Sequence, residues 1–249
     1  MMKSILFSGL ILIATTSVTA QTVDEVVDKY VEAIGGKEKL KNLQSIYMET
    51  VSVMQNGNEM TSKMWKVNEK LMRREINFGM GSMTSVITDK EGWNSNPRNG
   101  NKFEPVTPEV LKMQQGELDC AGPLVDYKSK GHTAELQGKE DVEGKECYKI
   151  KMTLKSGRDL TYYIDTKDYY IIRMKTKGGG MGGQRPGGGG GGGGANPDQE
   201  LIVDYSDFRK TPEGYVFPYA TTRVGMGAAT NVEKIEVNLP VDAKLYKAE

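Results

Sequence analysis

Apolar and polar residues alternate with a period of two along most of this chain. Such alternation is typical of β-strands that bury one face and expose the other. Turn residues separate the alternating segments, and the short loops between them favour antiparallel neighbours. The pattern predicts about ten or eleven antiparallel strands, over residues 44–51, 60–67, 71–78, 83–88, 134–138, 147–154, 160–165, 170–177, 201–208, 215–222 and 232–238.

Three shorter regions have the period of a helix instead. Apolar residues recur at helical spacing over 23–34, with Thr22 as the N-cap and Gly35-Gly36 as the end, and 37–43 could add a further turn. Thr107-Pro108-Glu109 predicts the start of a short helix that runs to 115. A second short helix is expected over 122–128.

A sheet of this length without a break is expected to curl, and its concave face must be buried against something. The N-terminal helix and the two short central helices are the elements available to cover it. The sequence has no internal repeat and no second domain, so we expect residues 21–249 to form a single α+β domain.

The first twenty residues have the composition of a secretory signal peptide. A basic start at Lys3 precedes an apolar run over 5–14 and the small-residue cleavage pattern 18–20. The run is too short to span a membrane, and a buried N-terminal helix is the less favoured alternative. Cleavage after Ala20 would leave Gln21 first, and no cysteine stands there to carry a lipid anchor. We therefore expect a soluble protein in an oxidising space, which in a bacterium is the periplasm.

Glycine is concentrated in one tract. Of the 30 glycines, 13 lie in residues 178–194, between two predicted strands. Such a tract buries too little apolar surface to offset the entropy of ordering, so we predict a disordered loop in place of a tight hairpin turn. It lacks the Gly-Lys-Ser/Thr ending of a phosphate-binding loop.

Charge and reactive residues exclude several function classes. Lys+Arg and Asp+Glu are both 33, so the chain has no net field to attract nucleic acid. His132 is the single histidine, which excludes multi-histidine zinc sites, and no nucleophile or cofactor motif indicates an enzyme. We expect no metal and no cofactor. Cys120 and Cys147 could form a disulfide or remain two buried thiols, and the sequence leaves both alternatives open.

The strand pattern places methionines and other apolar residues on one face of the predicted sheet. Methionine is flexible and polarizable, which suits a deformable apolar cavity. The alternative is that the same residues only pack a core beneath the helices. The inward candidates are Met48, Met72, Ile76, Phe78, Met83, Ile87, Ile150, Met152, Tyr162, Ile164, Ile172 and Met174.

Four segments together resemble the LolA-like outer-membrane lipoprotein-sorting proteins of Bacteroidetes-type bacteria. They are 30–40 (YVEAIGGKEKL), 122–128 (GPLVDYK), 204–209 (DYSDFR, with Gly214 and Pro218 after it) and 237–242 (VNLPVD). The resemblance implies a half-open antiparallel β-barrel with helices across its mouth. It also implies a non-enzymatic periplasmic carrier whose apolar cavity holds acyl chains.

The resemblance further implies partners: acyl chains of lipids or lipoproteins, an inner-membrane transporter and an outer-membrane acceptor, with the carrier acting as a monomer. Carriers of the family have an Arg-Pro segment, linked to release from the transporter, after their second strand. The comparable segment here, 67–70, contains neither residue, which favours general lipid binding over lipoprotein trafficking. The alternative is a non-carrier interaction module, such as an accessory subunit of an envelope complex.

Overall fold

A computed structural model describes residues 21–53, 57–79, 81–95, 97, 100–177, 200–225 and 228–249. The predicted signal peptide and the glycine tract 178–194 lie outside the described residues. The helices are α1 (Val23–Ala33), α2 (Lys37–Lys41), α3 (Pro108–Gln115) and a 3-10 helix, η2 (Ala243–Tyr246). The strands are β1 (Ser45–Val53), β2 (Glu59–Val67), β3 (Leu71–Asn77), β4 (Ser82–Thr88), β5 (Gly92–Ser95), β6 (Phe103–Pro105), β7 (Thr133–Val142), β8 (Lys145–Thr153), β9 (Asp159–Asp165), β10 (Ile171–Lys177), β11 (Glu200–Lys210), β12 (Val216–Arg223) and β13 (Ala228–Val237).

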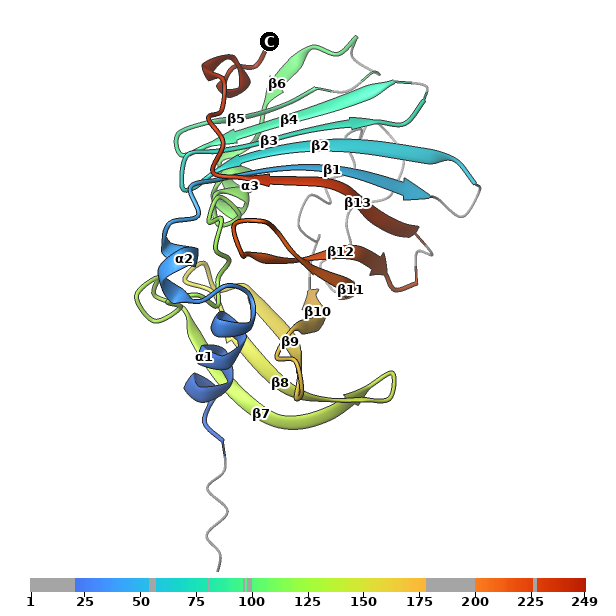
Figure 1. Cartoon of the computed structure of the whole chain (residues 1–249). Coiled ribbons are helices and arrows are strands. Elements are labelled where there is room, and N and C mark those ends of the chain that lie inside the picture. The colour runs from blue at the N-terminus through green and yellow to red at the C-terminus, as the bar shows by residue number, and fades with distance from the viewer. Residues whose placement is uncertain are drawn as a thin grey trace, which may run out of the picture.

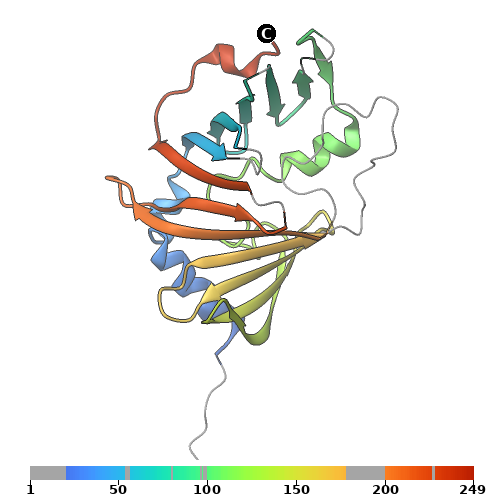
Figure 2. The ribbon, with the colours of Figure 1, turned by 90° about the vertical axis from the view of Figure 1, so that its right-hand side faces the viewer.

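Within the described residues the strands form one antiparallel sheet of thirteen, in the order β6-β5-β4-β3-β2-β1-β13-β12-β11-β10-β9-β8-β7. Each half is a meander of neighbouring strands, and the halves meet where β1 pairs with β13. The edge strands β6 and β7 do not pair, so the curled sheet stays open as a half-barrel (Figures 1 and 2). The predicted α+β half-open barrel is confirmed, with two more strands than the upper count, because β5 and β6 were not expected.

Helix α1 begins as the sequence predicts. The Thr22 hydroxyl accepts a hydrogen bond from the Glu25 amide at 3.3 Å, and the Glu25 carboxylate accepts one from the Thr22 amide at 2.8 Å. This capping box satisfies two of the free amides at the helix start. Gly35 and Gly36, with φ of 140° and 87°, then redirect the chain after the helix.

The second central helix, expected over 122–128, is wrong. The segment is a series of turns, in which Gly122 has a φ of 85° and Asp126 a φ of 50°. A helix cannot continue through a left-handed residue, so the composition there is that of a loop. The expected helix over 110–115 is present as α3, and Thr107 caps it by accepting from the Val110 amide at 3.4 Å.

The described residues form three apolar clusters. The largest packs α1, α2 and the turns after Gly122 against the concave face of β7–β12 and against Ile46 and Val237 at one end of the β1–β13 pair. A second lies on the opposite face of the same strands, around Cys147 and Tyr163. The third packs Leu111 of α3, and Leu118 after it, against Met72 of β3 and Ile87 of β4. The helices thus cover the two flanks of the concave face from separate positions (Figure 1).

Candidate functional site

The register of the N-terminal half determines which side chains share the concave face. Lys66 pairs with Ile46 and with Met72, which in turn pairs with Ile87. Two residues further along, Met48, Met64, Arg74 and Ser85 align, and beyond them Thr50, Ser62, Ile76 and Met83. The predicted inward residues Met48, Met72, Ile76, Met83 and Ile87 therefore lie on one face, and Phe78 continues the same parity after β3.

The predicted residues of the C-terminal half belong to a filled core. Ile150, Met152, Tyr162, Ile164 and Met174 are all buried in the cluster beneath α1. In this flank the side chains face inward as expected, but α1 already occupies the space in front of them. Packing of a core, the alternative interpretation of the pattern, describes this flank.

Ile172 does not face inward. The pairing of β10 with β9 shifts between Ile171 and Arg173, which turns Ile172 to the other face of the sheet. There it packs with Val142, Cys147 and Tyr163, while Ile171 packs against the concave cluster in its place. The prediction for Ile172 is wrong because one bulge reverses the alternation within a strand.

Between the two covered flanks, the middle of the concave face is covered only in part. We call this surface the concave strip and define it by Met48, Met64, Ile76 and Met83, all of which are half-buried. Ile235 and Val203, on β13 and β11, are half-buried apolar neighbours on the same face. The strip is apolar and methionine-rich, which are the properties of a surface that adapts to flexible chains.

Charged side chains border the concave strip, and the sequence analysis did not single them out. Lys66 and Arg74 occupy inward positions on β2 and β3, and Arg158 lies in the turn between β8 and β9. Glu117, which follows α3, approaches Arg158 with its Oε1 3.9 Å from Nη1. Burial lowers the pKa values of Lys66 and Arg74 and raises that of Glu117, against the opposing charges around each. Their inward parity was visible in the sequence, but nothing local indicated that they meet.

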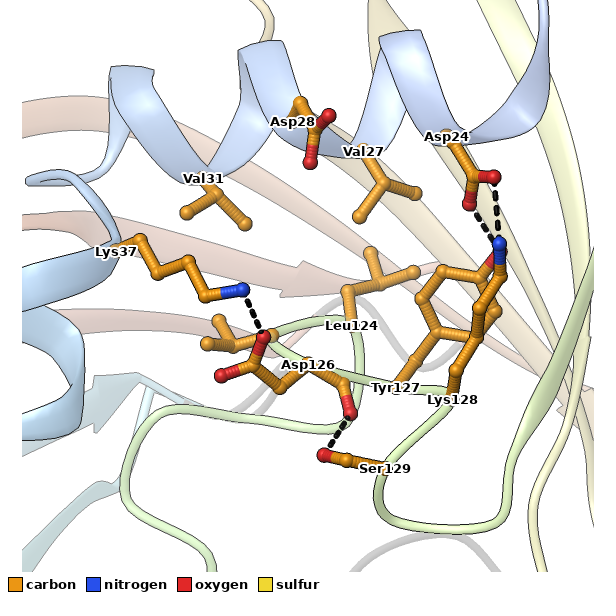
Figure 3. Close-up of a pocket in the computed structure, with 11 residues that line it drawn as sticks. Asp24, Val27, Asp28, Val31, Lys37, Leu124, Asp126, Tyr127, Lys128 and Ser129 are labelled. Atoms are coloured by element: carbon orange, nitrogen blue, oxygen red, sulfur yellow. Dashed lines mark hydrogen bonds and ion pairs between the residues drawn. The ribbon is translucent and has the colours of Figure 1, made fainter.

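A separate surface cleft of about 260 Å³ lies between α1, α2 and the turns after Gly122 (Figure 3). Val27, Val31 and Leu124 form its apolar lining. The Asp24 carboxylate accepts hydrogen bonds from Lys128 Nζ and from the Tyr127 hydroxyl, both at 2.6 Å, and these bonds lower its pKa.

Across the same cleft Lys37 Nζ lies 2.5 Å from Asp126 Oδ1, which lowers the pKa of Asp126. The two ion pairs bridge the helices and the turns. We interpret the cleft as the junction that fixes these turns to α1 and α2.

The two cysteines are free thiols, so of the two alternatives the structure has the buried thiols. Cys120 packs in the large concave cluster and Cys147 in the cluster on the opposite face of the sheet. Burial raises the pKa of each thiol to about 11. Among the described residues no group of three His, Cys, Asp or Glu side chains could hold a metal ion. In the same part of the chain, no helix has the length and apolar character needed to cross a bilayer.

No protein-family model matches the sequence, and no curated protein sequence matches it significantly. Solved structures do match. A DUF1329 family protein from Desulfovibrio piger is 13% identical, with 92% of this chain and 98% of that chain covered and a TM-score of 0.56. A LolA superfamily protein from Nitrosomonas europaea is 9% identical, with 92% and 99% covered and a TM-score of 0.56. At such identities the likeness concerns the fold, and by its fold this chain is a LolA-like half-open barrel.

Proposed function

We propose that this protein is a periplasmic carrier that binds the acyl chains of lipids or lipoproteins along its concave strip, without chemical change to them. The observation that carries the proposal is the strip itself. Apolar side chains at its centre, such as Met48 and Ile76, are left half-buried by the helices on either side. An apolar ligand in contact with them would remove that surface from water, at about 25 cal/mol per Å².

Two features bear on the cargo. The LolA-like fold supports a carrier of apolar chains. The turn 67–70 lacks the Arg-Pro segment that the family resemblance links to release from a transporter, and its residues are instead bound to the segment after α3. The Glu69 amide donates to the Leu118 carbonyl at 3.1 Å, and the Asn68 side chain accepts from the Cys120 amide at 2.9 Å. The proposal is therefore a carrier of acyl ligands in general, with an inner-membrane transporter and an outer-membrane acceptor as its expected partners.

The location follows from residues 1–20 as a cleaved signal peptide, with 21–249 as one domain that acts as a monomer. The protein recovered from the periplasm should begin at Gln21, which N-terminal sequencing measures directly. An N-terminus at Met1 in that fraction would contradict this part of the proposal.

The binding test compares two substitutions of the same kind. Ile76→Trp places an indole on the concave strip, whereas Met113→Trp places one on the outer side of α3, where Met113 is 39% exposed. Displacement of a fluorescent fatty acid should show an affinity weakened by about tenfold or more in Ile76→Trp and unchanged in Met113→Trp. Circular dichroism verifies that both variants are folded.

Native mass spectrometry of the wild-type protein from its own periplasm, followed by lipid extraction, supplies the ligand class. Bound acyl species would support the carrier. A protein that carries no lipid and displaces no probe would contradict the proposal and leave the interaction module as the better interpretation.

A further inference from the structure

The charged groups beside the concave strip come together from separate parts of the chain. Lys66 and Arg74 lie on the adjacent strands β2 and β3 and face inward. Arg74 pairs with Met64, two residues before Lys66. Glu117, in the segment after α3, interacts with both of them and with Arg158, which lies in the turn between β8 and β9. We call Lys66, Arg74 and Arg158 the basic cluster. Lys66 and Arg74 belong to the N-terminal half of the sheet, and Arg158 belongs to the C-terminal half. The Glu117 carboxylate interacts electrostatically with all three cations.

The cluster has more positive than negative charge. Arg158 Nη1 lies 3.9 Å from Glu117, the longest ion pair among the described residues. Lys66 Nζ donates to the carbonyl oxygen of Asp119 at 2.7 Å, but the Asp119 carboxylate is paired with Lys130 at 2.6 Å. The Asp119 carboxylate also acts on Lys66, so with Lys130 counted the group has four cations and two carboxylates.

Arg74 has even fewer partners. Its Nη2 lies 3.8 Å from the Met64 sulfur, and no carboxylate of the described chain comes within ion-pair distance of its guanidinium. Arg223, at the end of β12, adds a further positive charge that acts on Arg74. Arg74 is half-buried and has no carboxylate partner among the residues that the structure describes, so its guanidinium has hydrogen-bonding capacity available for a ligand.

Arg158 contributes a second, independent observation. Its Nε donates to Thr176 Oγ1 at 3.4 Å, but its Nη2 is buried and has no hydrogen-bond partner within the part of the chain that the structure describes. Buried donors without a partner are rare in native proteins, and each such group needs an explanation. A ligand oxygen at this position would satisfy it.

We propose that the basic cluster binds the anionic head group, a carboxylate or a phosphate, of the acyl ligand. This inference rests on the proposed carrier function and names the class of ligand as an anionic amphiphile. Guanidinium groups match the oxygens of carboxylates and phosphates in bidentate geometry, and their attraction is strong where water is partly excluded. A bound anion would offset the excess positive charge that burial disfavours.

The geometry also gives the direction of the acyl chain. Met64 lies opposite Arg74 across the β2–β3 pair, and Met48 lies opposite Met64 on β1. Ile76 and Met83 follow toward the far end of the same strands. A head group at Arg74 therefore places the chain on the concave strip, with its methyl end toward Ile76 and Met83.

The experiment separates head-group recognition from chain binding by three competitors of equal chain length. Dodecanoic acid, dodecyl phosphate and dodecanol each displace the fluorescent fatty acid from the full mature protein. The wild-type protein should bind the better of the two anions at least about tenfold more tightly than the alcohol. Whether the acid or the phosphate binds more tightly identifies the head group as a fatty-acid carboxylate or a lipid phosphate.

Arg74→Gln and Arg158→Gln should each reduce the ratio of anion to alcohol affinity by about tenfold, with little change in affinity for dodecanol. The control is Arg209→Gln, since Arg209 is exposed on β11 and paired with Asp207 at 2.5 Å. The control should keep the wild-type ratio. A ratio measured within one variant is unaffected by partial loss of stability, and the two arginines provide independent tests.

The outcomes distinguish this inference from the function on which it rests. The head-group site would be overturned if the wild-type protein bound dodecanoic acid and dodecyl phosphate no more tightly than dodecanol. It would also be overturned if both Gln variants kept the wild-type ratio of anion to alcohol affinity. Either result would leave the proposed acyl carrier function unaffected. Absence of binding by all three competitors would overturn the carrier itself.

Discussion

Gly92, at the start of β5, provides a stringent test of how tightly α3 packs on the sheet. A Cβ at this position would lie 2.8 Å from Ile87 Cδ1, 2.9 Å from Val106 Cγ2 and 3.3 Å from Leu111 Cδ1. Real Cβ atoms do not approach other carbons to less than 3.0 Å, so Gly92→Ala requires side chains to move. Ile87 is fully buried in the cluster beneath α3, and Leu111 belongs to α3 itself.

The expected loss is that of an overpacked core, about 1–3 kcal/mol in the free energy of unfolding. For a chain of this size that corresponds to a decrease in Tm of roughly 2–12 °C, measured by thermal denaturation monitored by circular dichroism. Gly116→Ala is the matched control. Gly116 follows α3 with an ordinary helical backbone, and its added Cβ would meet only the Met113 carbonyl oxygen at 3.5 Å. It should be neutral or slightly stabilising.

A double-mutant cycle tests the cause. Ile87→Val removes the atom that makes the closest contact, and alone it should destabilise by about 0.5–1.5 kcal/mol. In the Gly92→Ala background the same change should cost less, because it relieves the clash. Additive effects of the two changes, or a Gly92→Ala protein as stable as the Gly116→Ala control, would refute the packing described for α3.

The other predictions concern the capping box, the surface cleft and the thiols. Thr22→Ala should lower the free energy of unfolding by about 0.5–2 kcal/mol through loss of the α1 N-cap, whereas Thr22→Ser should not, in urea denaturation. The hydrogen bond from Lys128 is the main reason why the pKa of Asp24 is lowered in the folded protein. The ionised Asp24 therefore stabilises the fold above its unfolded pKa of about 3.9, and this stabilisation is lost as the pH falls through the lower folded pKa. Asp24→Asn should therefore be slightly less stable than wild type at pH 7 and equal to it in acid, and equal stability at both pH values would contradict the ion pair. Cys120 and Cys147 should react with a maleimide only after the protein is unfolded. Treatment with a reductant should leave the intact mass unchanged. An increase of about two mass units on reduction would indicate a disulfide.

Local chemistry made much of the fold predictable. The alternation of the long strands and the capping signal at Thr22 depend on residues close together in the chain, and both are present in the structure. Strands β5 and β6 have only four and three residues, too few to establish a period, so no pattern indicated them. The turns at 122–128 follow from the left-handed backbone of Gly122 and Asp126, which composition alone does not reveal.

The candidate site was predictable in part for the same reason. The alternation that places Met48 and Ile76 inward is local, and it is present in the structure. The bulge that turns Ile172 to the other face of the sheet arises from the pairing of β10 with β9. The basic cluster was missed because Arg74 and Arg158 lie on different flanks of the sheet. In the sequence, a single cation among inward apolar residues only breaks the alternating pattern. Its partners are known only once the tertiary structure shows which residues lie beside it.

The pairing of β1 with β13 has a consequence for how the chain folds. Every other strand pair joins neighbours along the sequence, whereas this ladder joins the two ends, as in the hydrogen bond from the Gln44 amide to Asn238, 194 residues later. Contacts of such separation form slowly, because their loop must close before they stabilise anything. Each meander can assemble by itself, but the junction must wait until the C-terminal strand has been delivered. Until then the edge of β1 has no partner strand, so a chain synthesised N-terminus first remains vulnerable to aggregation until its last strand arrives.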